Sequence, residues 1–269
     1  EFRNYFRGIR IIMPRHRGIF NRENPEPYEL SRSRIENFVR CKSCFYMEQI
    51  EGIKFPSIPG FNINEATDVL LKRDFDKYRK AKEPHPYLVN AGYDFLIPYE
   101  HEHFEKWTQS MHFGAKDRLH YVDAVTNLKV GGGLDDVWLN INTNCLHVVD
   151  YKSTSQKSDK GPITLDDWWK ASYKRQMDLY VWVLEKKGFP VDRIGYFLYC
   201  DADRFEEYNF LNKNNAEMRF KINLIEYEVN HSWIQPVLEE ISQTIQLSER
   251  PEHNDFCEYG KFLKNSASQ

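Results

Sequence analysis

Three residues of this sequence, Asp135, Asp150 and Lys152, have the side-chain types and the spacing that metal-assisted acid–base chemistry uses. Asp150 and Lys152 are two residues apart, so in a β-strand their side chains emerge on the same face. Asp135 follows a run of three glycines and would lie opposite them if the two segments pair as a hairpin. The spacing therefore predicts two carboxylates and a lysine together at one end of a sheet.

Such a group suits the hydrolysis of phosphodiester bonds. Hard divalent cations such as Mg2+ or Mn2+ prefer carboxylate oxygens, and such ions stabilise the attacking hydroxide and the departing oxygen. We therefore predict Asp135 and Asp150 as metal ligands, with the backbone carbonyl of Tyr151 as a further oxygen ligand. A lysine beside the ion can orient the water or hold negative charge in the transition state, and Lys152 is predicted for that role.

An Asp-x-Lys pair on a strand also occurs as a surface salt bridge, and that alternative explains most isolated cases. Here Asp150 ends an apolar run that contains Leu146, Val148 and Val149. A carboxylate at the end of such a run is costly to bury unless it has a partner or a metal. The location favours the functional interpretation.

The surrounding sequence predicts an α/β fold. Stretches rich in Val, Leu, Ile, Tyr and Trp predict strands, and turns at 126–127 and 142–144 separate the first three. Thr164 is a candidate cap and Gly188 a candidate stop for the long helix that follows. A strand meander followed by a helix and a strand is typical of a single α/β domain. The predicted strands are 118–125, 128–142, 145–153, 194–200 and 219–229, and the predicted helices are 33–50, 63–80, 165–187 and 233–247.

Two short segments resemble the signature of a known nuclease family. Gly-Gly-Leu-Asp at 132–135 and Val-Asp-Tyr-Lys at 149–152 are similar to two motifs of the PD-(D/E)XK nuclease superfamily, in its RecB-like branch that includes CRISPR-associated exonucleases. Gln176 and Tyr180 match the Gln-x-x-x-Tyr motif of that branch, and their spacing puts them on one helix face. The resemblance implies a restriction-endonuclease-like mixed central β-sheet flanked by helices. It also implies that Gln176 and Tyr180 line the catalytic site and contact DNA.

The resemblance extends to the first predicted helix, where the stretch 31–46 looks like the opening Ser-x-Ser…Phe-x-x-Cys…Phe-Tyr helix of the same branch. Basic side chains on this helix and on the long helix are predicted to bind phosphates. A solvated helix face is the alternative for each of them. The predicted nucleic-acid-binding residues are Arg34, Arg40, Lys174 and Arg175, with Arg32, Lys42 and Lys170 as further members of the two basic faces.

At one position the sequence departs from the family pattern. Many relatives have a histidine on the second helix, and Asp68 stands at the matching position here. The resemblance leaves two alternatives: Asp68 reaches the metal, or that ligand is absent. His101, His103 and His112 are the other candidates for the missing ligand.

The cysteines are the second departure. Some relatives bind an iron–sulfur cluster through one N-terminal cysteine and three near the C-terminus, and a cluster needs four thiolates. This sequence has Cys41, Cys44 and Cys257 at those ends, so we predict no iron–sulfur cluster. A zinc site that also uses His253 is the less favoured alternative to metal-free cysteines. Cys200 ends an apolar strand and is predicted to be a small buried side chain.

The composition indicates the class of protein. With 41% hydrophobic and 15% aromatic residues in 269, the chain can bury a sizeable core. Five cysteines, an odd count, argue against a secreted disulfide framework. The sequence has no apolar run of about 18 residues and no signal peptide, so we expect a soluble cytoplasmic protein without membrane contact. Residues 1–30, rich in arginine, are predicted as a basic arm or irregular lead-in, and residues 31–269 as one nuclease-like domain.

These features predict a divalent-metal-dependent nuclease that hydrolyses DNA, single- or double-stranded. The first alternative is a catalytically weak or inactive binding or assembly subunit with the same fold, and the second is an RNA-directed nuclease. The sequence has no Gly-x-x-x-x-Gly-Lys-(Ser/Thr) loop of a helicase motor. A processive role would therefore involve a helicase, recombination or CRISPR partner protein.

Overall fold

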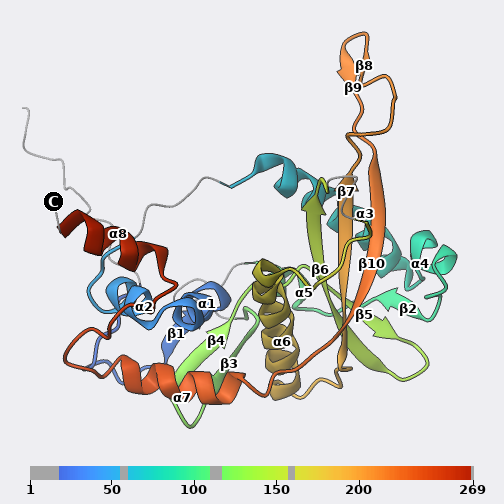
Figure 1. Cartoon of the computed structure of the whole chain (residues 1–269). Coiled ribbons are helices and arrows are strands. Elements are labelled where there is room, and N and C mark those ends of the chain that lie inside the picture. Colours follow the sequence, from blue (N-terminus) through green and yellow to red (C-terminus); the bar gives the residue numbers. More distant parts are fainter. Residues whose placement is uncertain (1–17, 55–59, 110–116, 157–160, 268–269) are drawn as a thin grey trace, which may run out of the picture.

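A five-stranded mixed sheet forms the centre of the computed structural model, which describes residues 18–54, 60–109, 117–156 and 161–267 (Figure 1). In spatial order the strands are β10 (Phe220–Glu228), β7 (Ile194–Ala202), β6 (Cys145–Thr154), β5 (Asp136–Asn140) and β2 (Leu96–Pro98). β6 runs parallel to β7, and the other neighbours are antiparallel. Parallel strands need a crossover connection, and the long helix between β6 and β7 supplies it. The predicted α/β class, with a mixed central sheet flanked by helices, is confirmed.

A smaller sheet contains β1 (Tyr28–Ser31), β4 (Leu128–Gly131) and β3 (His120–Asp123) in that order. β1 pairs in parallel with β4, so the last residues of the segment predicted as an arm or lead-in form a strand. The predicted strand 128–142 is wrong as a single strand, because β4 joins the small sheet and β5 joins the central one. The glycine-rich stretch between them therefore crosses from one sheet to the other.

The turns that the sequence predicts are present. Asn127 has a φ of 55° and Asn144 a φ of 57°, which is the left-handed conformation that asparagine tolerates better than most residues. These two turns connect β3 to β4 and β5 to β6. They set the register of both hairpins.

The first predicted helix, 33–50, is wrong as a single helix. It consists of α1 (Arg32–Arg40) and α2 (Lys42–Gln49), separated by Cys41. The backbone of Cys41 is extended, with φ −163° and ψ 112°, and an α-helix cannot continue through a residue in that conformation. The second predicted helix is confirmed as α3 (Asn62–Ala81).

The long helix α6 (Ala171–Lys186) begins later than the predicted residue 165. A single 3-10 turn precedes it, and Thr164 accepts a hydrogen bond from the Asp166 N–H at 3.4 Å instead of capping the helix. Gly188, with a φ of +89°, follows the C-cap residue Lys187 and ends the helix as predicted. Among the described residues, no helix is long and apolar enough to span a lipid bilayer. The remaining helices are α7 (Ile234–Thr244), which was predicted, and α4 (Pro86–Asn90), α5 (Phe104–Trp107) and α8 (Glu258–Ala267), which were not.

The two faces of the central sheet pack against different helices. Val148 belongs to the core cluster that contains α6, whereas Val149 and Tyr151 belong to the cluster that contains Phe75 of α3. Neighbouring residues of β6 thus face opposite sides, as the period of two in a strand requires. The same alternation turns the side chain of Asp150 toward α6.

One buried carboxylate on α6 fastens the helix to the start of α7. Asp178 accepts hydrogen bonds from Tyr227 Oη at 3.0 Å, from the Asn230 N–H at 3.0 Å and from Trp233 Nε1 at 2.9 Å. We expect Asp178→Ala to lower the free energy of unfolding by about 2 to 3 kcal/mol, because three donors lose their acceptor. Urea denaturation measures this change, with the exposed Asp166→Ala as the matched control. Equal losses in the two variants would contradict the prediction.

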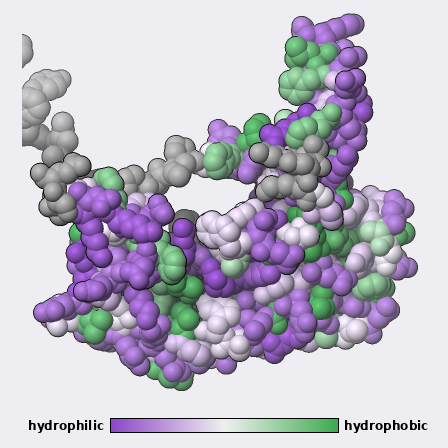
Figure 2. Space-filling view, viewed as in Figure 1, coloured by the Kyte–Doolittle hydropathy of each residue, from purple (hydrophilic) through white to green (hydrophobic). Residues whose placement is uncertain are grey.

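The long strands β7 and β10 continue into a hairpin formed by β8 (Leu211–Asn212) and β9 (Asn215–Ala216), which projects from the body of the protein (Figure 1). Two apolar side chains near its base, Phe210 and Leu211, are 52% and 74% exposed. Figure 2 shows hydrophobic residues, in green, on this projection. Since these side chains are largely in solvent, the hairpin contributes little to the core.

Candidate active site

The β5–β6 hairpin brings Asp135 and Asp150 together. Asp136 pairs with Val149, so the preceding residue, Asp135, lies across from Asp150. Asp135 Oδ2 accepts a hydrogen bond from the Tyr151 N–H at 2.9 Å. The backbone of β6 therefore holds the carboxylate that the neighbouring strand presents.

Asp150 is only 1% exposed and has two partners from different elements. Its Oδ1 accepts a hydrogen bond from Gln176 Nε2 of α6 at 2.8 Å, and its Oδ2 forms an ion pair with the Lys152 ammonium. Burial raises the pKa of the Asp150 carboxyl to about 7, with a further increase from the charge of Asp135 and an opposing effect from Lys152. A divalent cation at this carboxyl would favour its charged form.

Tyr180 holds the glycine-rich crossing between the sheets. Its phenol donates a hydrogen bond to the carbonyl of Gly133 at 2.6 Å, and a Cβ atom at Gly132 would lie 2.9 Å from its oxygen. The glycine at 132 is thus required by the close approach of the tyrosine. Burial raises the pKa of Tyr180 well above its ordinary value, and Arg32 of α1 lies close enough to oppose that shift. The phenol therefore stays protonated and acts as a donor.

Asp68 reaches the same place from α3. Lys72 Nζ lies 2.8 Å from Asp68 Oδ2 and 3.2 Å from Asp135 Oδ1, so its ammonium bridges the two carboxylates. Burial and the charge of Asp135 raise the pKa of Asp68, and Lys72 opposes them. Sequence reasoning missed Lys72; its i,i+4 spacing from Asp68 on one helix was the signal that could have found it.

The donor set fits a hard divalent cation. Asp135 and Asp150 offer carboxylate oxygens, and Asp68 stands next to Asp135 with a third. The carbonyl of Tyr151 lies on the same strand end, 3.4 Å from Lys152 Nζ. Mg2+ and Mn2+ prefer oxygen ligands of these kinds. The Lys72 ammonium supplies part of the positive charge that such an ion would bring to these carboxylates.

The comparison with known families decides the identity of this arrangement. Residues 61–262 match the family model of the PD-(D/E)XK nuclease superfamily. The chain belongs to this superfamily. No curated protein matches the sequence. PD-(D/E)XK nucleases generally use Mg2+ or Mn2+ and bind nucleic acids, so membership points to a metal-dependent nuclease.

The histidines proposed for the missing PD-(D/E)XK ligand have other neighbours. His101 stacks on Trp107 with ring centroids 4.3 Å apart, and His103 Nε2 lies 3.7 Å from a Glu102 oxygen. His112 lies outside the described residues. Of the candidates within the described residues, Asp68 is the one whose contacts connect it to the carboxylates.

Several of the basic residues that were predicted to bind nucleic acid form hydrogen bonds or ion pairs within the protein. Arg175 forms two hydrogen bonds of 2.8 Å with the carboxylate of Glu36, which joins α6 to α1. Arg34 donates to the carbonyl of Glu29 at 3.0 Å, and the buried Lys170 pairs with Asp167 at 2.9 Å. Lys42 forms an ion pair with Glu240. Arg40 is exposed and Lys174 is half-buried, and these two remain predictions as phosphate contacts.

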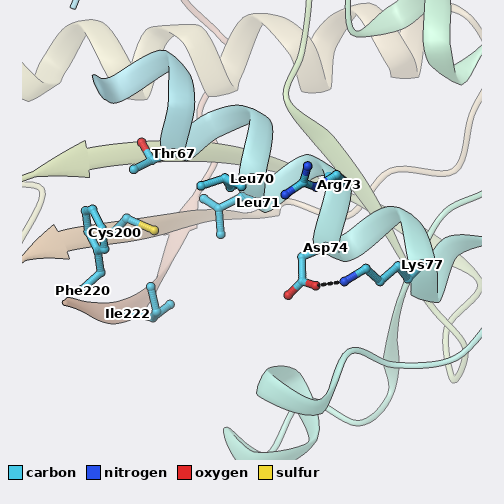
Figure 3. Close-up of a pocket in the computed structure, with 9 residues that line it drawn as sticks. All are labelled: Thr67, Leu70, Leu71, Arg73, Asp74, Lys77, Cys200, Phe220 and Ile222. Carbon is cyan, nitrogen blue, oxygen red and sulfur yellow. Dashed lines mark hydrogen bonds and ion pairs between the residues drawn. The ribbon is translucent and has the colours of Figure 1, made fainter. Parts of the chain in front are cut away.

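A pocket of about 320 Å³ opens along α3, where the helix faces the end of β7 and β10 (Figure 3). Asp135, Asp150 and Lys152 are not among its lining residues. Thr67 belongs to both regions, since it lines the pocket and its hydroxyl contacts that of Ser153 on β6. The carboxylate site of this superfamily member is thus separate from the pocket. The pocket is lined by Thr67, Leu70, Leu71, Arg73, Asp74, Lys77, Cys200, Phe220 and Ile222.

Proposed function

We propose that this chain is a divalent-metal-dependent nuclease that hydrolyses the phosphodiester bonds of DNA. The observation that carries the proposal is the convergence of Asp135, Asp150 and Lys152 at one end of the β5–β6 hairpin. Asp150 is buried there, and a buried carboxylate is retained where something pairs with its charge. Membership in a nuclease superfamily supports the same reaction class.

Each residue has a role that its contacts support. Asp135, Asp150 and the carbonyl of Tyr151 hold Mg2+ or Mn2+, with Asp68 as a further ligand. The bound ion supplies charge stabilisation for the attacking water and the departing oxygen. Gln176 fixes the orientation of the Asp150 carboxylate through the 2.8 Å hydrogen bond.

Lys152 acts on the nucleophilic water or on the charge of the scissile phosphate. Its ammonium lies at the Asp150 carboxylate and 4.7 Å from the centre of the Tyr173 ring, so its position is defined from two sides. A cation held in place before the reaction stabilises developing negative charge without a reorganisation cost. Lysine suits this role because it offers a compact positive charge with several donors.

We assign the chain to the RecB-like branch as part of this proposal. In that branch the Gln-x-x-x-Tyr motif lies on the helix after the active-site strands. Here Gln176 contacts Asp150 and Tyr180 contacts Gly133, so both motif residues support the two strands that carry the carboxylates. Arg32 of α1 lies beside Tyr180 and is therefore a candidate contact for the DNA strand. A helicase, recombination or CRISPR partner remains a prediction.

Metal dependence tests the proposal directly. End-labelled single- and double-stranded DNA should be cut by the purified chain with Mg2+ or Mn2+ and left intact in EDTA, because the carboxylates alone supply no Lewis acid. Adding excess Mg2+ to the EDTA sample should restore cutting, and product lengths on a gel separate exonuclease from endonuclease action.

An RNA of the same sequence is the matched substrate control. Faster cutting of RNA than of DNA would favour the RNA-directed nuclease. Binding of DNA without cutting under any metal would favour the assembly subunit, in which Lys72 and Lys152 neutralise the carboxylates permanently. Cutting that persists in EDTA would contradict the proposed metal site.

A further inference from the structure

Four potential metal ligands from the two ends of the described chain lie together, away from the carboxylates. They are Cys41, Cys44, His253 and Cys257, and their ligand atoms all lie within 4.8 Å of one another. His253 Nδ1 lies 3.4 Å from Cys41 Sγ, 3.6 Å from Cys44 Sγ and 3.4 Å from Cys257 Sγ. The Sγ atoms of Cys44 and Cys257 are 3.4 Å apart. Each sulfur thus faces the same imidazole nitrogen.

The sulfur–nitrogen separations match the edges of a tetrahedral zinc site, and the Cys44–Cys257 sulfur separation is about 0.3 Å shorter than such an edge. With Zn–S bonds of about 2.3 Å and a Zn–N bond of about 2.0 Å, a tetrahedron has S···S edges of about 3.7 Å and S···N edges of about 3.5 Å. The observed S···N distances of 3.4 to 3.6 Å agree with that geometry. The cysteines are not disulfide-bonded, so all three sulfurs are available as thiolate ligands.

The local backbone is arranged to keep the four ligands together. Cys41 is the extended residue that separates α1 from α2, and Cys44 follows in the first turn of α2. On the other side, a Cβ atom at Gly260 would lie 2.5 Å from the Cβ of His253, so only glycine permits this approach. The Gly260 N–H also points to Cys257 Sγ at 3.4 Å, a contact that stabilises a thiolate.

A second contact fixes the segment that carries His253 and Cys257. Asn254 Nδ2 donates to the carbonyl of Arg40, the residue before Cys41, at 2.6 Å. The three cysteines are at most 9% exposed and form a cluster of their own. The ligands are therefore held by both segments in an enclosed position.

We propose that Cys41, Cys44, His253 and Cys257 bind one Zn2+ as a structural site. Three thiolates and one imidazole with no open position are a ligand set of structural zinc sites. Iron–sulfur clusters of the four-cysteine type would need a fourth thiolate where His253 stands. Cys41 and Cys44 lie outside the residues that match the superfamily, so the site rests on the tertiary contacts of this chain.

The zinc would fasten the C-terminal segment to the α1–α2 pair (Figure 1). The two pairs of ligands, Cys41 with Cys44 and His253 with Cys257, are separated by more than 200 residues, and a link that closes so long a loop restricts the unfolded chain. By holding α1 in place, the zinc would also help to position the carboxylate site, because Glu36 of α1 binds Arg175, the neighbour of Gln176. The zinc thus supports the helix pair without taking part in the reaction, and its presence does not depend on the proposed nuclease activity.

Metal analysis of the whole chain tests the site. Protein produced in medium with both zinc and iron should contain one zinc per chain by elemental mass spectrometry. Cys41→Ser, Cys257→Ser and His253→Ala should lose most of it, whereas His253→Cys should retain it because a thiolate replaces the imidazole. Cys145→Ser, at a half-exposed cysteine outside the cluster, and Asp150→Asn, in the carboxylate site, are the matched controls and should keep the zinc.

A measurement on the unmodified chain tests the zinc site even if the substituted chains fail to fold. Titration with a thiol-binding mercurial should release the zinc and lower Tm, and thiol plus Zn2+ should restore both. Replacement by Co2+ should give the intense visible bands of tetrahedral cobalt together with thiolate charge-transfer absorption. Three results would overturn the proposal: a zinc-free wild type, iron with cluster absorption, or a Cys44–Cys257 disulfide detected by mass.

Discussion

Lys152→Ala and Asp150→Asn are each expected to slow DNA cleavage by about 10²- to 10³-fold or more, the cost of removing one preorganised group from the charge-stabilising set. Lys152 provides a fixed positive charge, and Asp150 provides the carboxylate that Gln176 and Lys152 hold in place. Asparagine keeps the Oδ1 acceptor for Gln176 and has nearly the same shape. Its effect on folding should therefore be smaller than its effect on cleavage.

The measurement is the single-turnover rate on end-labelled DNA with saturating Mg2+, together with circular dichroism and Tm for every variant. Lys106→Ala and Asp166→Asn are the matched controls, since both residues are exposed and lie outside the carboxylate site. Their rates should equal that of the wild type. A folded Lys152→Ala chain that cuts at the wild-type rate would remove Lys152 from the mechanism.

Arg79→Met is expected to destabilise the fold by about 3 to 5 kcal/mol, the cost of removing one partner from a buried ion pair. Arg79 Nη2 lies 2.6 Å from Asp136 Oδ1, and both side chains are buried. The guanidinium also donates to the carbonyl of Tyr99 at 2.6 Å. Among the described residues, Asp136 would keep three neutral donors: Tyr151 Oη at 2.6 Å, the Val137 N–H at 2.7 Å and Trp138 Nε1 at 3.2 Å.

Urea denaturation gives the loss in the free energy of unfolding. Lys80→Met, on the same helix and exposed, is the control and should change it little. The double variant Arg79→Met, Asp136→Asn should recover part of the loss, because it removes the uncompensated charge. A loss below about 1 kcal/mol, the value of a surface pair, would show that solvent reaches Asp136.

The adjacent residues Asp135 and Asp136 have different roles. Both side chains pair with cations of α3: Asp136 is fully buried and neutralised by Arg79, while Asp135 pairs with Lys72 and accepts a hydrogen bond from the Tyr151 N–H of β6. Asp136→Asn should therefore act mainly on stability. The sequence placed Asp135 opposite Asp150 on condition that the two segments form a hairpin, and the family motif agreed; the pairing of Asp136 with Val149 gives the register that this placement needs.

The short-range features of this protein were predictable from the sequence. The period of two in a strand placed Asp150 and Lys152 on one face, and the i,i+4 spacing placed Gln176 and Tyr180 on one face of α6. The turns at Asn127 and Asn144 and the end of α6 at Gly188 followed from the backbone preferences of asparagine and glycine. Each of these depends on residues within a few positions of one another, so local geometry determines them.

Only the tertiary structure decided the features that depend on distant partners. The bridge from Lys72 to Asp135 and the pairing of Glu36 with Arg175 join segments that no local pattern relates. The sequence offered a zinc site of the three cysteines and His253 only as the less favoured alternative, because the contact of Cys41 and Cys257 with His253 becomes evident only when both segments are placed in space. The physical reason is that burial and charge compensation depend on which side chains meet in space, and a one-dimensional pattern does not contain that information.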